Sequence, residues 1–333
     1  MPNDVDQYVL TFDTLVAGIL LVITILGSVL VSFWNSDAPR TWRGFANHAV
    51  PPEWYRHPSA RADIWFVLSV RVVNALLAVP ILLTAVGIGL LLNHGLRSIA
   101  SYPPATEPLT LVGLIGFTVL MLIVNDFGNY IYHYALHKVP ILWELHKVHH
   151  SAEVLIGFTR FRVHPIDVFL NKLWDGITGG IVYGVWLFFG YPSIDLAIYA
   201  ATIYRLRNIL MFETTRHTHY KISFGKFLDQ IFISPHYHQL HHSSAPQHWD
   251  KNFGVSITLW DRLFGTFMAP TPNETFVFGL SGAEHANYRS CLKLYMVPIV
   301  NLLKMGRKRS VTSQNGTTAT SLVAELETPV VEI

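Results

Sequence analysis

The sequence has few charged residues and a single cysteine. Charged side chains make up 14% of its 333 residues, whereas a soluble domain usually carries about 25%. Together with the 51% share of hydrophobic residues, this shortage indicates a membrane protein. A formal net charge of +2 gives no argument for a nucleic-acid partner. Because Cys291 stands alone, an internal disulfide, a cysteine-based metal site and an iron–sulfur cluster are all excluded.

Several enzyme fingerprints are also missing. There is no G-x-G-x-x-G dinucleotide motif and no His-Glu-x-x-His zinc-protease motif. The N-terminus begins with the acidic run Met1-Pro-Asn-Asp, and no small-residue cleavage site follows the first apolar run. That run is therefore expected to be retained, rather than removed as a signal peptide.

Histidines, in contrast, are abundant and concentrated. Twelve of the 17 lie between His133 and His242. Eight of them form three boxes with short, repeated spacing, which are His133 and His137; His146, His149 and His150; and His238, His241 and His242. Neutral imidazole is the commonest protein ligand for metals, and eight histidines exceed the usual four ligands of one zinc ion. The boxes therefore predict two metal ions held by nitrogen.

Each box fits a helix. Side chains at positions i, i+3 and i+4 lie on one helical face, with Cβ atoms about 5–6 Å apart. The spacing thus predicts three helical faces that meet around the metals. The apolar run 109–124 is expected to continue as a helix to His137, which would carry the first box out of the bilayer.

Several apolar runs are long enough to cross a bilayer, which takes about 20 residues as a helix. Residues 15–33, 64–92 and 109–124 qualify, and Pro80 is expected to kink the second run. Residues 173–191 and 194–211 contain charges and are interpreted as a hairpin that dips into the bilayer or just crosses it. Residues 292–303 are too short to span and are expected at the interface.

The basic residues predict the orientation, because Lys and Arg tend to remain cytoplasmic. Several follow the first and third apolar runs, whereas only Arg97 follows the second. This asymmetry predicts a multi-pass protein with all three boxes facing the cytoplasm. A transporter would place its ionisable residues at the bilayer midplane, so boxes outside the apolar runs disfavour transport.

The residues around the boxes carry a family resemblance. The strings that carry it are Asp126-x-x-x-Tyr130-x-x-His133-x-x-x-His137, Trp143-x-x-His146-x-x-His149-His150-Ser151, Arg162-x-His164-Pro165, Arg216-His217-Thr218-His219, His238-x-x-His241-His242-Ser243 and Asn252-Phe-Gly-Val. Over residues 109–266 the chain resembles the fatty acid hydroxylase/sterol desaturase superfamily. It looks closest to the branch that includes alkylglycerol monooxygenase and bacterial sterol desaturase-like proteins.

This resemblance implies an all-α integral membrane protein. Its transmembrane helix bundle would have a cytoplasmic helical cap that carries a histidine-rich di-metal site. Together with the apolar runs and the Ser/Thr-rich composition of the C-terminus, the resemblance divides the chain into N-terminal transmembrane helices and loops in 1–108, a catalytic domain in 109–270, an interfacial segment in 271–309 and a disordered tail in 310–333.

The resemblance also implies two iron ions and O2 as co-substrate. The implied reaction is hydroxylation or desaturation of a C–H bond in a fatty acyl, alkyl or sterol-like membrane lipid. Hydroxylation is favoured, although the boxes serve both reactions. Eight histidines do not fill two six-coordinate irons, and His217 and His219 are the candidates for further metal ligands. Asp126 and His164 are expected to support ligands by hydrogen bonding.

Electrons are expected from a separate ferredoxin, cytochrome or reductase. Some members carry a fused cytochrome b5 domain marked by His-Pro-Gly-Gly, but the nearest string here is His57-Pro-Ser-Ala. A metal-binding transporter or sensor without catalysis is the alternative from a different functional class.

Overall fold

The described part of the chain is helical. The computed structural model describes residues 4–100, 110–190, 203, 206–271, 274–282 and 284–314. Within these residues the β-structure is limited to two isolated bridges, Phe232–Ile257 and Ser243–Phe278. The predicted all-α character is therefore confirmed for this part of the chain.

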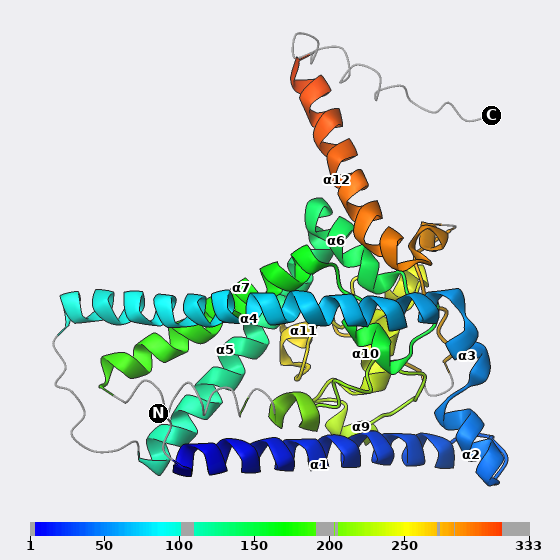
Figure 1. Cartoon of the computed structure of the whole chain (residues 1–333), viewed down its shortest axis with the longest axis horizontal. Coiled ribbons are helices and arrows are strands. Elements are labelled where there is room, and N and C mark those ends of the chain that lie inside the picture. Colours follow the sequence, from blue (N-terminus) through cyan, green and yellow to red (C-terminus); the bar gives the residue numbers. More distant parts are fainter. Residues whose placement is uncertain are drawn as a thin grey trace, which may run out of the picture.

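Four long helices form the body of the protein. They are α1 (Asp4–Trp34), α4 (Pro58–Ile99), α5 (Leu111–Lys138) and α7 (Pro165–Phe188). In Figure 1 all four extend to the left, and the shorter elements gather at the other end. Among the described residues, Leu15–Trp34 and Leu111–Lys138 are long and apolar enough to cross a membrane, with mean hydropathies of 2.7 and 2.0. These two segments favour a membrane protein.

Prolines open two of the three histidine-bearing helices. Pro140 opens α6 (Pro140–His150) and Pro235 opens α10 (Pro235–His241), because proline lacks the N–H that a first helical turn leaves unpaired. Pro140 also disfavours a helical Val139, which is extended at φ −95° and ψ 114°. Helix α5 therefore runs through His137, as predicted, and the chain then turns sharply into α6.

The remaining elements are short, except for the last helix. They are α2 (Trp42–Ala49), α3 (Pro52–Arg56), η1 (Gly157–Phe161), α9 (Gly225–Leu228), η2 (Pro246–His248), α11 (Leu259–Leu263), η3 (Glu284–Tyr288) and α12 (Cys291–Gln314). Phe66 of α4, Val148 of α6 and Leu294 of α12 are buried in one core cluster. This cluster ties the helix of the second box to α4.

Helices α4 and α7 approach each other closely through glycines. A Cβ atom on Gly180 would lie 2.7 Å from the Ala85 carbonyl oxygen, and one on Gly184 would lie 2.7 Å from the Gly89 carbonyl oxygen. Small residues at four-residue spacing allow this kind of backbone contact between membrane helices. The contact fixes α7, whose first turn reaches the histidine site.

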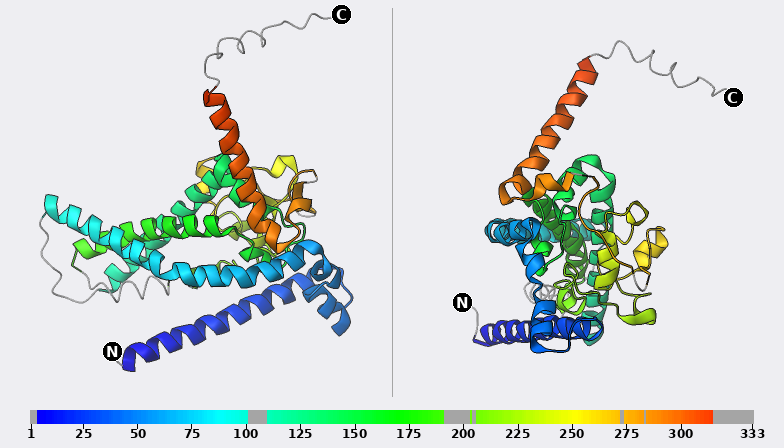
Figure 2. Two further views of the ribbon diagram at one scale, coloured as in Figure 1. Left: turned by 45° about the horizontal axis from the view of Figure 1, so that its top comes forward. Right: turned by 90° about the vertical axis from the view of Figure 1, so that its right-hand side faces the viewer.

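Two of the predicted apolar segments lie within long helices. Residues 64–92 lie inside α4, which continues as a helix through Pro80. Residues 292–303 lie in α12, which projects away from the other elements in Figures 1 and 2. Helix α12 continues past residue 310, where the tail was expected to begin, and residues 315–333 lie outside the described part. Most of the second half of the expected hairpin, 194–211, also lies outside the described residues.

Candidate metal centre

The three boxes meet at one end of the long helices. Box one is on α5, box two on α6 and box three on α10, with His242 directly after the end of α10. Within the described residues their side chains, together with His217, form two groups in which all ligand atoms lie within 4.8 Å of one another.

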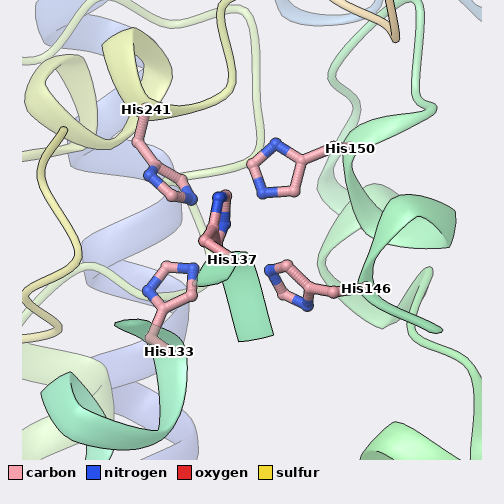
Figure 3. A group of neighbouring side chains, drawn as sticks. All are labelled: His133, His137, His146, His150 and His241. Carbon is pink, nitrogen blue, oxygen red and sulfur yellow. The ribbon is translucent and has the colours of Figure 1, made fainter. Parts of the chain in front are cut away.

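The first histidine group is shown in Figure 3, where five rings from α5, α6 and α10 surround a common centre. It consists of His133, His137, His146, His150 and His241. Except in His133, the Nε2 atom of each is buried and has no hydrogen-bond partner. Buried polar atoms are nearly always paired. The unpaired nitrogens therefore fit a metal ion, which would accept all of their lone pairs at once.

The second histidine group consists of His149, His217, His238 and His242, all of them buried. The Nε2 atom of His217 lies 3.1 Å from that of His149 and 2.9 Å from that of His238. The His242 Nε2 atom lies 3.1 Å from that of His238. A hydrogen on one of these nitrogens can bond to only one neighbouring nitrogen, so the lone pairs of the others would face one another. A metal ion between the four rings would accept these lone pairs.

Two histidine doublets, His149-His150 and His241-His242, join the groups. Adjacent helical residues point about 100° apart, so one member of each doublet enters each group. The His150 and His242 rings, one from each group, are stacked with centroids 4.6 Å apart. The expectation that all three histidines of box two share one face is therefore corrected, because His149 points to the second group whereas His146 and His150 point to the first.

Hydrogen bonds to backbone carbonyls fix the ring orientation of three histidines. The Nδ1 atoms of His133, His149 and His241 lie 2.9, 3.2 and 2.8 Å from the carbonyl oxygens of Phe253, Arg162 and Lys251. A carbonyl can only accept, so each Nδ1 carries the hydrogen and each Nε2 keeps its lone pair. Partners of this kind usually accompany metal-bound histidines.

The electrostatic environment keeps the histidines neutral. Burial, reinforced by the neighbouring histidines, lowers the pKa of His149, His150 and His242 well below 6.5. Neutral imidazole is the form that binds metal. At neutral pH these three rings, which come from both groups, therefore favour the metal-binding form.

Asp167 is the supporting residue that the sequence analysis missed. Its Oδ2 atom lies 3.0 Å from His146 Nδ1, and its Oδ1 atom accepts a 2.7 Å hydrogen bond from the Tyr132 hydroxyl. Asp167 is in the first turn of α7, 21 residues after His146. The only local signal was an acidic residue shortly after His164-Pro165, and this pattern is equally typical of an ordinary helix start.

Asp126 acts on the histidines indirectly. Its carboxylate accepts hydrogen bonds from the backbone of Ser256 and Ile257 and from the Trp260 indole. It therefore holds the loop that also carries Phe253, whose carbonyl orients His133. The structure shows no hydrogen bond between Asp126 and a histidine of either group within the described residues.

Two other predicted site residues lie outside the groups. His164 caps α7, where its Nδ1 accepts from the Ile166 N–H, and its Nε2 lies 3.3 Å from the Tyr295 carbonyl. His219 Nε2 lies 2.7 Å from the His48 carbonyl. The structure brings neither into contact with the metal-ligand atoms of the two groups, so we leave both out of the proposed ligand set. His217, in contrast, joins the eight box histidines.

Two cavities reach the histidines. The larger has a volume of about 470 Å³ and is lined by His133 and His146 of the first group and His149, His217 and His238 of the second. The smaller, of about 330 Å³, is lined by His137, His150 and His241 of the first group alone. Both volumes are in the range of small-molecule sites.

Comparison with known proteins shows what part of the chain is similar to a known family. Residues 118–266 match the model of the family described as fatty acid hydroxylase. The predicted resemblance is confirmed. The matched region begins within α5, ends just beyond α11, and contains all nine histidines of the two groups.

Named relatives of the matched region include a monooxygenase, a hydroxylase and an oxidase. Alkylglycerol monooxygenase from Homo sapiens is 32% identical over 156 residues, which is 47% of this chain and 31% of the relative. Ornithine lipid hydroxylase OlsE from Rhizobium tropici is 30% identical over 164 residues, 49% of this chain and 45% of the relative. Lathosterol oxidase from Homo sapiens is 29% identical over 168 residues, half of each chain. The match spans half of these relatives' length or less, and no solved structure matches.

Proposed function

We propose that this protein is a membrane-bound, O2-dependent di-iron oxygenase that hydroxylates a C–H bond of a lipid. The observation that carries the proposal is the convergence of nine histidines in two adjacent groups beside one cavity. Imidazole suits iron, and the names of the relatives, a monooxygenase, a hydroxylase and an oxidase, support an oxidation of lipid.

The proposed ligands are five histidines for one ion and four for the other. Bound iron would supply the activation of O2 that C–H oxidation needs. The chain's own residues supply position: Asp167 holds His146, and the carbonyls of Phe253, Arg162 and Lys251 hold three further rings. The larger cavity touches both groups, so a lipid chain that lies in it would present its C–H bonds to both metals.

The smaller cavity is the proposed side for electron delivery. It is lined by the polar residues Lys147, Asp250 and Glu284 and by histidines of the first group. Trp143 also lines it, with its ring centroid 4.9 Å from that of His137. A separate ferredoxin, cytochrome or reductase would dock over this opening on the cytoplasmic face.

Two other functions remain as candidates. A desaturase would use the same ligands, and the match to Delta(7)-sterol 5(6)-desaturase ERG3B from Gibberella zeae favours that chemistry. A transporter or sensor would bind metal without consuming O2. It is disfavoured because the larger cavity adds a space of about 470 Å³, partly lined by apolar residues, to the metal groups.

Lipid profiling by mass spectrometry tests these functions. Membranes from cells with and without the chain are compared under ¹⁸O2, with His150→Ala as the inactive control. A lipid that gains one labelled oxygen atom supports hydroxylation, and one that loses two hydrogen atoms supports desaturation. The same lipid profile with and without the chain, together with metal bound to the purified protein, would leave only transport or sensing.

A further inference from the structure

The larger cavity has an excess of positive charge. Four basic side chains line it, but only two carboxylates do, those of Asp167 and Glu213. Asp167 is engaged by His146 and Tyr132. Glu213 is shared between two arginines, with its oxygens 3.1 Å from Arg160 Nη2 and 3.3 Å from Arg207 Nη2. Neither carboxylate is therefore available to neutralise a further cation in the cavity.

Arg216 is that further cation. Its side chain is 3% exposed, and its Nη2 atom donates to the carbonyls of Met211 and Ile233 at 3.0 and 3.5 Å. Its Nε atom is buried and has no partner among the described residues. Among the residues that the structure describes, no carboxylate lies within 4.0 Å of the Arg216 guanidinium. A buried charge is costly unless it is paired, so the site favours an incoming anion.

The geometry suits an oxyanion at the end of an apolar chain. Arginine presents N–H groups in a planar fork that matches carboxylate and phosphate oxygens. The same cavity has apolar lining from Val70, Leu136 and Phe161, which would contact a hydrocarbon chain. It also touches both histidine groups, so a head group held at Arg216 would fix which carbon atoms lie beside them.

We propose that the larger cavity selects lipids with an anionic group, a phosphate or a carboxylate, which binds to Arg216. Arg160 and Arg207 add positive charge that Glu213 partly neutralises. The inference rests on the proposed function, because it assigns the lipid of that function to a charge class. It makes Arg216 a specificity-determining residue.

The test measures binding by the full chain, purified in a neutral detergent. Ligands that bind only the folded protein raise its melting temperature with increasing concentration, which gives an apparent affinity. The probes are hexadecyl phosphate and hexadecanoate, with hexadecanol as the neutral chain and inorganic phosphate as the free anion. We expect the two anionic chains to bind more tightly than hexadecanol, and inorganic phosphate to bind weakly.

Three variants sharpen the test. Arg216→Gln should weaken binding of hexadecyl phosphate by at least about tenfold, because one partner of a buried charge pair is lost. Glu213→Gln should strengthen it, because Arg160 and Arg207 lose their carboxylate. Arg61→Gln is the matched control, since Arg61 is exposed on α4 and does not line the cavity. If Arg216→Gln does not fold, Glu213→Gln carries the test alone.

Several results would overturn the inference. Hexadecanol binding as tightly as hexadecyl phosphate would remove the charge selectivity, and so would a Glu213→Gln variant with unchanged affinity. Inorganic phosphate binding as tightly as the alkyl phosphate would mean a site for free anions instead of lipids. Oxygen incorporation into a neutral lipid would sink this inference while leaving the proposed function intact. Anion-selective binding without any lipid oxidation would refute the proposed function and leave the charge selectivity of the cavity intact.

Discussion

The Arg162 guanidinium lies 2.7 Å from the Asp63 carboxylate, and neither side chain is exposed. The same guanidinium donates to the carbonyls of Val148 on α6 and Tyr288 on η3. The backbone carbonyl of Arg162 in turn orients His149. One buried ion pair therefore links α4 to the helix of box two and to the second histidine group.

Asp63→Asn should destabilise the protein strongly. It leaves the buried Arg162 charge without its carboxylate, a change that typically costs about 3–5 kcal/mol. We expect a clearly lower melting temperature for the purified protein in detergent. Asp37→Asn, at an exposed position, is the control and should melt like the unmodified chain. Equal melting temperatures for the two variants would show that the ion pair adds no stability.

Asp167→Asn should weaken metal binding without unfolding the protein. The variant keeps the size of the side chain but removes the charge beside His146, and losses of about 10–100-fold in metal affinity are typical for such partners. Competition with a chelator, read by elemental analysis, measures the affinity. Asp175→Asn, on the same helix but bound to Lys172, should behave like the unmodified protein. The same affinity in both variants would remove Asp167 from the site.

His217→Ala and His219→Ala should differ, although the two residues are nearly adjacent. His217 lies in the second histidine group, whereas His219 bonds to the His48 carbonyl. We expect His217→Ala to lose one of the two proposed ions and His219→Ala to keep both, as measured by metal content per chain. A loss of metal in His219→Ala but not in His217→Ala would contradict the assignment.

The metal-free protein should become less stable as the pH falls below about 6.5. Burial lowers the pKa of His150, His241 and His242 in the folded state, so below 6.5 the unfolded chain binds more protons than the folded one. The contribution of these histidines to the free energy of unfolding is therefore fully present above pH 6.5. It declines as the pH drops toward their lowered folded-state pKa values. Melting temperatures between about pH 8 and 5.5 measure it. The double variant His150→Asn, His242→Asn should decline less, and a melting temperature that rises on acidification would refute the argument.

Cysteine labelling tests the proposed orientation. Ser281 is exposed at the smaller cavity, and Ser98 is exposed near the far end of α4. In a Cys291→Ser background, Ser281→Cys should react with an impermeant reagent only from the cytoplasmic side, and Ser98→Cys only from the opposite side. Labelling of both positions from the same side would rule out a membrane crossing by α4.

Much of the site was predictable because its signal is local. The box spacing identified eight of the nine grouped histidines, and His217 was already a candidate ninth. The division into two groups was not predictable, because it depends on how α5, α6 and α10 face one another. Asp167 was missed for the same reason, since only the packing of α7 brings it to His146. The close α4–α7 contact at Gly180 also escaped prediction, because its partner residues lie far away in sequence.

The histidine doublets have a consequence for how the centre assembles. Because His149 and His150 are neighbours on one helix, an ion that orders the first group also fixes the backbone that offers His149 to the second. Filling of the two groups should therefore be cooperative, with half-loaded protein scarce at intermediate iron concentrations. The same coupling makes the centre intolerant of register changes. One residue inserted in α6 before His146 would rotate the whole box by about 100° and misalign both groups in a single step.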